Sequence, residues 1–145
     1  ANERCGKTKQ FCFNKFDAGP VQKICRNKNR VFKHHQQMSI APTPEPPYYA
    51  VIFTSQHTNV NWEEYEATSA KMVELAQEMP GFLGVESVRN EDGFGITSVY
   101  WKDNESIDSW RNHGEHKKAK KRGRAIWYEK YFLRIAKVEK DYGKI

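Results

Sequence analysis

Three residues suited to chemistry lie close together in the chain, where Trp110 is followed by His113 and His116. An imidazole titrates near neutral pH, so either histidine could serve as a general base. Trp110 comes three residues after Ile107 and three before His113, a spacing that predicts one helical face directed toward a core. The competing interpretations are simpler: the histidines would be solvated beside Lys117, and Trp110 would only fill the core.

A second constellation combines residue types that bind metals: Cys5, Cys12, Cys25, His34 and His35. It lacks the closely spaced cysteine pair that zinc knuckles use, so a zinc module is the less favoured interpretation. Two other interpretations stay open. The segment could be a basic arm that contacts acidic partners, or an upstream sequence that is not native, with Met38 as the natural start. We predict no metal site.

The charge distribution divides the chain into two parts. Residues 1–37 contain nine basic and two acidic residues, whereas residues 38–145 contain 15 basic and 16 acidic ones, so the net charge of +6 arises in the first part. Four prolines within residues 42–47 predict an extended spacer. We therefore expect a basic N-terminal arm or non-native extension over residues 1–37, a proline-rich linker over 38–47 and one folded domain over 48–143.

Composition also excludes whole classes of protein. The chain has no apolar run of the roughly 18–20 residues that a membrane helix needs, and its polar, basic start is unlike a secretory signal peptide. We expect a soluble cytoplasmic protein with no membrane partner. The run Lys117–Arg124 holds six positive charges in eight residues. Because a helix spreads such charges around its circumference, we interpret the run as a solvated face and expect no nucleic-acid partner.

Hydrophobic periodicity within residues 48–143 predicts four strands and two helices in the order β-α-β-β-α-β. The strands are expected at Tyr48–Ser55, Phe82–Asn90, Phe94–Trp101 and Tyr131–Val138. Asn61 followed by Glu64 predicts a capping box at the start of the first helix, and Pro80-Gly81 ends that helix. This order of elements is the ferredoxin-like arrangement, so we predict an α+β fold.

The second helix carries the candidate chemistry and has its own boundary signals. Asp103 or Asn104 is expected to cap its start. Gly114 is expected to break it, and a short basic helix should continue from Glu115 to about Arg122.

The predicted strands carry apolar side chains on both faces of the sheet. One face would hold Phe53, Val99 and Trp101, and the other Ile52, Ile96 and Tyr100. Two helices can cover only one face, so the other must be buried against something else. A second copy of the same sheet is the simplest partner by symmetry, and we predict a homodimer.

The domain over residues 48–143 resembles the antibiotic biosynthesis monooxygenase (ABM) domains. The motifs that carry the resemblance are Pro80-Gly81-Phe82-Leu83-Gly84, Tyr100-Trp101, Ser106-x-x-x-Trp110-x-x-His113 and Gly123-Arg124-x-x-Trp127. More narrowly, Tyr48–Ser55 and Asp92–Thr97 look like a small bacterial subgroup of unassigned substrate. The resemblance covers about two thirds of the chain, and residues 1–37 have no counterpart in it.

The resemblance implies a dimeric α+β barrel with an active cavity in each protomer, between the sheet and the helices. Its haem-degrading members use an Asn on the first strand, a Trp on the second helix and a His about ten residues later. Here Trp110 matches the Trp, Phe53–Ser55 contains no Asn, and Lys120 stands at the position of the His. Its cofactor-free members oxidise phenols or quinols, with the substrate anion itself activating O2.

These considerations give a set of site residues. Phe53, Trp101 and Trp110 are expected to wall the cavity and bind substrate, and His113 or His116 to act as catalytic base beside Trp110. We predict a monooxygenase that acts on a small aromatic or quinol-type substrate without a metal cofactor. Two alternatives stay open, a haem-binding or haem-degrading monooxygenase and a non-catalytic dimeric barrel that binds a small ligand.

Overall fold

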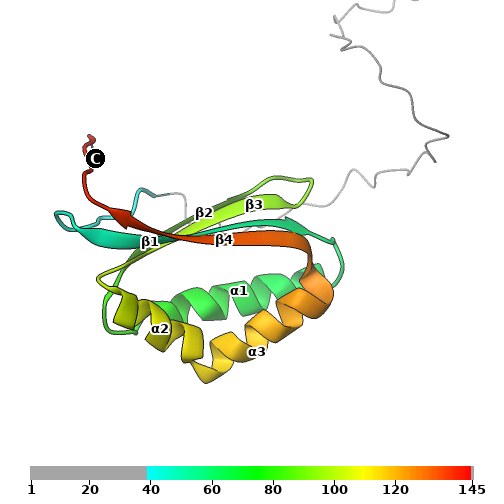
Figure 1. The fold of residues 1–145 in the computed structure, drawn as a ribbon. Helices are drawn as coiled ribbons and strands as arrows, with labels where there is room; N and C mark the ends of the chain where they lie inside the picture. Colours follow the sequence, from blue (N-terminus) through cyan, green and yellow to red (C-terminus); the bar gives the residue numbers. More distant parts are fainter. Residues whose placement is uncertain (1–38, 145) are drawn as a thin grey trace, which may run out of the picture. The chain divides into compact units, whose positions relative to one another are not determined.

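A computed structural model describes residues 39–144 of the chain (Figure 1). The predictions made for residues 1–37, among them the cysteine and histidine metal module, lie outside the described residues. The described chain forms β1 (Tyr48–His57), α1 (Trp62–Gln77), β2 (Phe82–Arg89), β3 (Phe94–Trp101), α2 (Asn104–Asn112), α3 (Gly114–Arg122), a π-helical segment (Gly123–Trp127) and β4 (Tyr128–Val138). None of these helices is long and apolar enough to cross a membrane.

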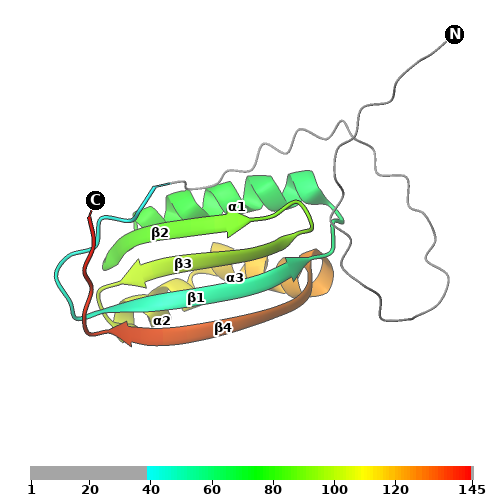
Figure 2. The same cartoon turned by 90° about the horizontal axis from the view of Figure 1, so that it is seen from above.

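The four strands form one antiparallel sheet in the order β2-β3-β1-β4. All three helices lie on the same face of this sheet (Figure 1, Figure 2). The first and last strands are neighbours, as the ferredoxin-like arrangement requires. The α+β fold predicted from the sequence is therefore confirmed, with β4 starting three residues before the predicted Tyr131.

The first helix starts where predicted but by a different mechanism. Asn61 has left-handed backbone angles, φ 52° and ψ 47°, and its side chain accepts no hydrogen bond from the helix. Instead, Asn61 Nδ2 donates to Glu64 Oε2 at 3.4 Å. The predicted capping box is wrong, because a capping side chain needs an extended backbone to reach the N–H groups of the first turn.

The second helix confirms one boundary signal and corrects another. Asp103 caps α2, since its Oδ1 accepts hydrogen bonds from the backbone N–H of Ser106 at 2.8 Å and from its hydroxyl at 2.7 Å. The break falls at His113 (φ −58°, ψ 133°), one residue before the predicted Gly114, which instead begins α3. The extended backbone at His113 sets a new direction for every side chain that follows it.

The core between sheet and helices is centred on Trp101, which is 0% exposed. Trp101 packs against Ala76, Ile107 and Trp110, and the ring of Phe82 meets it edge-on with 5.6 Å between ring centroids. The prediction that one helical face carries Ile107, Trp110 and His113 toward the sheet is confirmed for Ile107 and Trp110, whereas His113 lies at the end of α2. This packing holds α2 over the end of β3.

The other face of the sheet is also apolar. The strand register places Ile52, Ile96 and Phe132 on this face, opposite to Phe53. Among them, Ile96 is 39% and Phe132 60% exposed. The described helices leave this face uncovered (Figure 1), as the alternation of the strands predicted.

Part of the segment before β1 packs on this same sheet. Ala41 is buried, and its backbone N–H donates to Glu86 Oε1 at 2.9 Å. A Cβ added to Gly84 would lie only 2.7 Å from the Cβ of Ala41. The missing side chain of Gly84 therefore makes room for Ala41.

We expect Gly84→Ala to lower the free energy of unfolding by about 1–2 kcal/mol, because the two methyl groups would overlap. The double variant Gly84→Ala/Ala41→Gly should recover most of that loss, as measured by urea unfolding. An equal loss in the single and double variants would show that the contact with Ala41 is not the cause.

Candidate functional site

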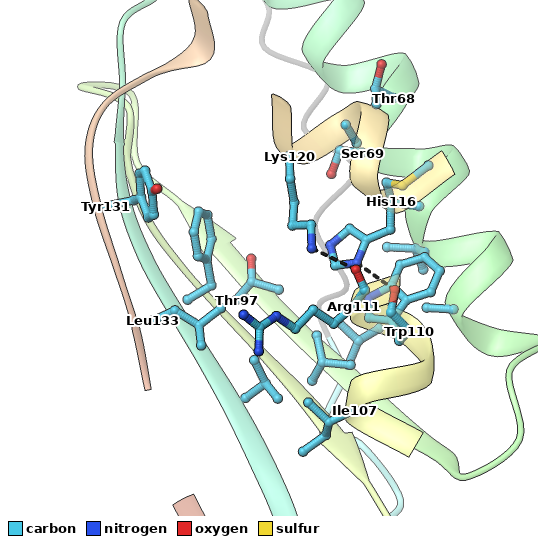
Figure 3. Close-up of a pocket in the computed structure, with 18 of the residues that line it drawn as sticks. Thr68, Ser69, Thr97, Ile107, Trp110, Arg111, His116, Lys120, Tyr131 and Leu133 are labelled. Carbon is cyan, nitrogen blue, oxygen red and sulfur yellow. Dashed lines mark hydrogen bonds between the residues drawn. The ribbon is translucent and has the colours of Figure 1, made fainter. Parts of the chain in front are cut away.

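A cavity of about 560 Å³ lies between the helices and the sheet. Figure 3 shows Trp110, His116 and Lys120 on the helical side and Thr97 and Leu133 on the sheet side. All three predicted wall residues, Phe53, Trp101 and Trp110, line this cavity. His116 lines it as well, whereas His113 does not.

The cavity opens along β4, the strand at one edge of the sheet. Tyr131, Leu133 and Ile135 line the cavity, yet these residues are 46%, 48% and 51% exposed. Their exposure shows that the helices do not cover β4 as they cover the strands beside it. A ligand therefore has access past this edge.

His116 is held against Trp110 by stacking and by a hydrogen bond. The two rings are nearly parallel, 14° apart, with 4.4 Å between their centroids. His116 Nδ1 lies 3.0 Å from the backbone oxygen of Trp110. A carbonyl oxygen can only accept, so Nδ1 carries the hydrogen and Nε2 of the neutral ring keeps its lone pair.

The electrostatic surroundings keep this imidazole neutral. Burial lowers the pKa of His116 from 6.5 to about 4, and the charge of Lys120 adds to the effect, although the hydrogen bond to Trp110 opposes it. At neutral pH the ring is therefore uncharged and can accept a proton at Nε2. The neutral ring is available to accept a proton from a substrate inside the cavity, and its lowered pKa makes it a weaker base than a free imidazole.

His113 occupies a different position, at the break between α2 and α3. Its ring stacks on Trp110 with 5.5 Å between centroids, and its Nδ1 is buried without a hydrogen-bond partner in the described chain. The structure brings His113 to the Trp110 ring but not to the cavity wall. Of the two predicted bases, only His116 faces the cavity.

A buried arginine at the other end of the cavity was missed by sequence reasoning. Arg89 Nη2 donates to Ser55 Oγ at 2.9 Å and to the Tyr65 hydroxyl at 3.0 Å, and Nη1 donates to the carbonyl of Gly93. Tyr128 lines the same cavity. Burial raises the pKa of its hydroxyl, and the electrostatic interaction with Tyr65 adds to the effect. This end of the cavity is therefore a polar cluster held by one guanidinium.

The signal for Arg89 was present in the strand alternation. Arg89 is four residues after Val85 on β2, and residues an even number apart share one face of a strand. Val85 faces the helices and lines the cavity. A charged residue at the end of a hairpin strand is usually solvated, so the alternation alone did not single it out.

His57 lies behind this cluster and is 2% exposed. Its Nδ1 accepts a hydrogen bond from the backbone N–H of Asn59 at 2.8 Å, and the rings of Trp62 and Tyr65 meet it edge-on at 4.4 and 4.5 Å. Burial lowers its pKa from 6.5 to about 4, with the charge of Arg89 adding to the effect. His57 therefore serves the packing between β1 and α1 rather than the cavity.

The lowered pKa of His57 predicts a loss of stability in mild acid. In the unfolded chain His57 binds a proton below about pH 6.5, whereas in the folded chain it does so only below about pH 4. The contribution of neutral His57 to the free energy of unfolding is therefore fully present above pH 6.5 and is lost as the pH falls to about 4. We expect a decrease on the order of 1–3 kcal/mol, measured by urea unfolding at several pH values.

The matched control for this titration is His57→Gln, which removes the ionisable ring. It should show a shallower decrease between pH 6.5 and 4, with the remainder due to His116. Carboxylates such as Glu115, whose pKa is lowered to about 2 by Lys118 and Lys71, lose their contribution only below about pH 4.5. Identical slopes in the wild type and His57→Gln would contradict the assignment.

The amino-acid sequence is related to those of known proteins. The sequence model of the family "Antibiotic biosynthesis monooxygenase" matches residues 48–122. The chain is also 54% identical over 102 residues to the uncharacterized protein YqjZ of Bacillus subtilis, in a match that spans 70% of this chain and 89% of YqjZ.

Solved structures share the fold at low sequence identity. SnoaB, a cofactor-independent oxygenase from Streptomyces nogalater, superimposes with a TM-score of 0.59 at 12% identity and covers 68% of this chain and 100% of its own. PA3566 from Pseudomonas aeruginosa gives a TM-score of 0.55 at 13% identity over 68% of this chain and 99% of its own. These similarities support the topology of the fold. The chemistry has to be inferred from the residues that line the cavity.

Proposed function

Because the chain belongs to the antibiotic biosynthesis monooxygenase family, we propose that it is a monooxygenase that oxidises a small phenol or quinol without a metal cofactor. The observation that carries the proposal is the neutral imidazole of His116, stacked on Trp110 at the wall of an aromatic cavity. Such a cavity can exclude water from an electron-rich ring while one polar atom removes its proton.

The proposed reaction takes all its electrons from the substrate. His116 Nε2 accepts the phenolic proton, and the resulting anion reduces O2. In a phenol, a ring C–H bond is replaced by a carbonyl, and the phenol becomes a quinone. In a quinol, a ring C–H bond becomes C–OH and both original hydroxyls become carbonyls, which gives a hydroxyquinone. In both cases one oxygen atom of O2 enters the product, and the other leaves as water with two hydrogens from the substrate.

The side chains around His116 have supporting roles in this proposal. Phe53, Trp101 and Trp110 wall the cavity and hold the flat ring of the substrate by stacking and edge contacts. We assign the base to His116 rather than to His113, because only His116 lines the cavity.

Haem binding is the alternative that the family suggests, and His116 Nε2 could offer a lone pair to iron. The residues fit haem degradation less well. Phe53 lines the cavity on β1, where the haem degraders have an Asn nearby, and Lys120 replaces their histidine. Its ammonium donates to the backbone oxygen of Arg111 at 2.7 Å, so it has no lone pair for a metal. We therefore favour the reaction without a metal.

We propose further that the protein works as a homodimer in the cytoplasm. The exposed apolar side chains on the outer face of the sheet, such as Phe132 at 60% exposure, support a partner there. A second sheet of the same kind would bury this surface by two-fold symmetry.

The function is tested by oxygen uptake with a panel of phenols and quinols, using 18O2 and mass spectrometry of the product. We expect one O2 consumed for each product formed and one labelled oxygen atom in it. Binding of the panel without uptake would instead favour a non-catalytic barrel. A Soret shift on titration with haem, followed by loss of the haem spectrum, would favour the haem-degrading alternative.

Trp110→Phe tests whether the indole forms part of the binding site. We expect a loss of about 1–2 kcal/mol in the free energy of unfolding, since most of the apolar volume is kept, but about tenfold weaker binding of a quinone. Quenching of tryptophan fluorescence by the quinone measures this affinity. Trp62→Phe, at a buried position outside the cavity, is the matched control and should bind as the wild type does. Equal binding by both variants would remove Trp110 from the site.

A further inference from the structure

The charged side chains that line the cavity are all of one sign. Four cationic residues, Arg89, Arg111, Lys120 and Arg124, contribute to its wall, and none of its described lining residues is an aspartate or glutamate. A cavity with mostly apolar walls and charges of one sign concentrates a field of that sign inside it. The electrostatic field of the cavity therefore favours an anion.

Two of these cations lie together on the helical side. Lys120 Nζ donates to the backbone oxygen of Arg111 at 2.7 Å. In Figure 3 the side chain of Arg111 extends from α2 toward the sheet, whereas Lys120 points from α3 to that backbone oxygen. Within residues 39–144, neither side chain forms an ion pair with a carboxylate. Burial lowers the pKa of Lys120, and the positive charges of Arg111 and Arg124 add to that effect.

The basic run on α3 thus separates into two sets. Lys118 pairs with Glu115 at 2.7 Å and Arg122 pairs with Glu64 at 2.8 Å, so these cations are neutralised outside the cavity. His116, Lys120 and Arg124 are spaced four residues apart and line the cavity, as one face of a helical stretch does. Lys120 is partly buried and does not fit the interpretation of the whole run as a solvated face, whereas Arg124 lines the cavity and is also exposed.

We infer that the cavity binds an aromatic acid whose carboxylate is held by Arg111 and Lys120. This inference rests on the proposed function and narrows its substrate class to phenols or quinols that also carry a carboxylate. An arginine can bind both carboxylate oxygens, and a lysine adds a compact charge. The ring of the ligand then lies against Trp110 and reaches His116. Bringing the anion in relieves the repulsion between the two cations.

The experiment compares 2-naphthoate with 2-naphthamide, which have the same rings but differ in charge. Binding of each to the wild-type protein is measured by isothermal titration calorimetry at low ionic strength. We expect 2-naphthoate to bind at least tenfold more tightly than the amide. Arg111→Met and Lys120→Met should each reduce this ratio to about threefold or less, while the amide binds as before.

Lys118→Met is the matched control, because it removes the same charge from the same helix outside the cavity. It should keep the wild-type ratio. A ratio near one in the wild type, no binding of either probe, or an unchanged ratio in both cavity variants would overturn the inference. The outcome is independent of turnover: a preference for the acid without oxygen uptake refutes only the monooxygenase, and uptake without a preference refutes only the carboxylate site.

Discussion

His116→Gln should lower kcat for phenol or quinol oxidation by about 100-fold or more while the protein stays folded. General base catalysis contributes roughly 10²–10⁴ in rate, and glutamine has no nitrogen that can accept the proton. The glutamine amide can still donate to the Trp110 oxygen that His116 contacts at 3.0 Å, so the local structure should be kept. Steady-state oxygen uptake measures the effect, and thermal unfolding checks the fold.

The matched control is His113→Gln, on the other side of the helix break, where the ring does not line the cavity. It should change kcat by less than about threefold. The pH profile adds a second readout. The activity of the wild type should fall as the pH drops through about 4, where His116 becomes protonated, and His116→Gln should lack this limb. Equal losses in the two variants would show that the base is another group.

Ile52→Glu should convert the proposed dimer into a monomer. Ile52 lies on the central strand β1, on the apolar face that the helices leave uncovered. A dimer through this face should bury on the order of 1,500 Å² or more, and an unpaired carboxylate in its centre would cost several kcal/mol. Size-exclusion chromatography with light scattering should show twice the 17.0 kDa of the chain for the wild type and a single chain for the variant.

The control for the dimer is Val60→Glu, in the loop between β1 and α1. Val60 is an exposed apolar residue like those of the sheet, at 51%, but it lies outside the apolar face, so its variant should stay dimeric. A wild-type protein that is monomeric at micromolar concentration would contradict the assembly outright.

Much of the fold could be predicted because alternation and helical spacing are local signals. The strands around Gly93 and the helix capped by Asp103 follow directly from them. The wrong capping box at Asn61 and the misplaced helix break at His113 have a shared cause. Asn61 and His113 both take backbone conformations that depend on tertiary packing, and residue type alone does not determine these.

The candidate site was predictable to a different degree. Strand alternation places Phe53 and Trp101 on one face of the sheet, and helical spacing directs Trp110 toward that face. Their common position at the cavity could therefore be expected. The choice between His113 and His116 could not be made from spacing, because the extended backbone at His113 rotates α3 relative to α2. The hydrogen bond from Lys120 to the backbone oxygen of Arg111 joins α3 to α2 across that break and has no signature in the sequence.

The edge position of β4 has a consequence for the kinetics of ligand exchange. The open side of the cavity is bordered by Tyr131, Leu133 and Ile135, whose backbone is tied to β1 along its length. Entry past a strand needs only rotation of side chains, which takes picoseconds to nanoseconds, whereas a lid formed by a loop opens in microseconds to milliseconds. Ligands should therefore associate at rates set by diffusion and by the fit of the encounter, with no slow isomerisation step before binding.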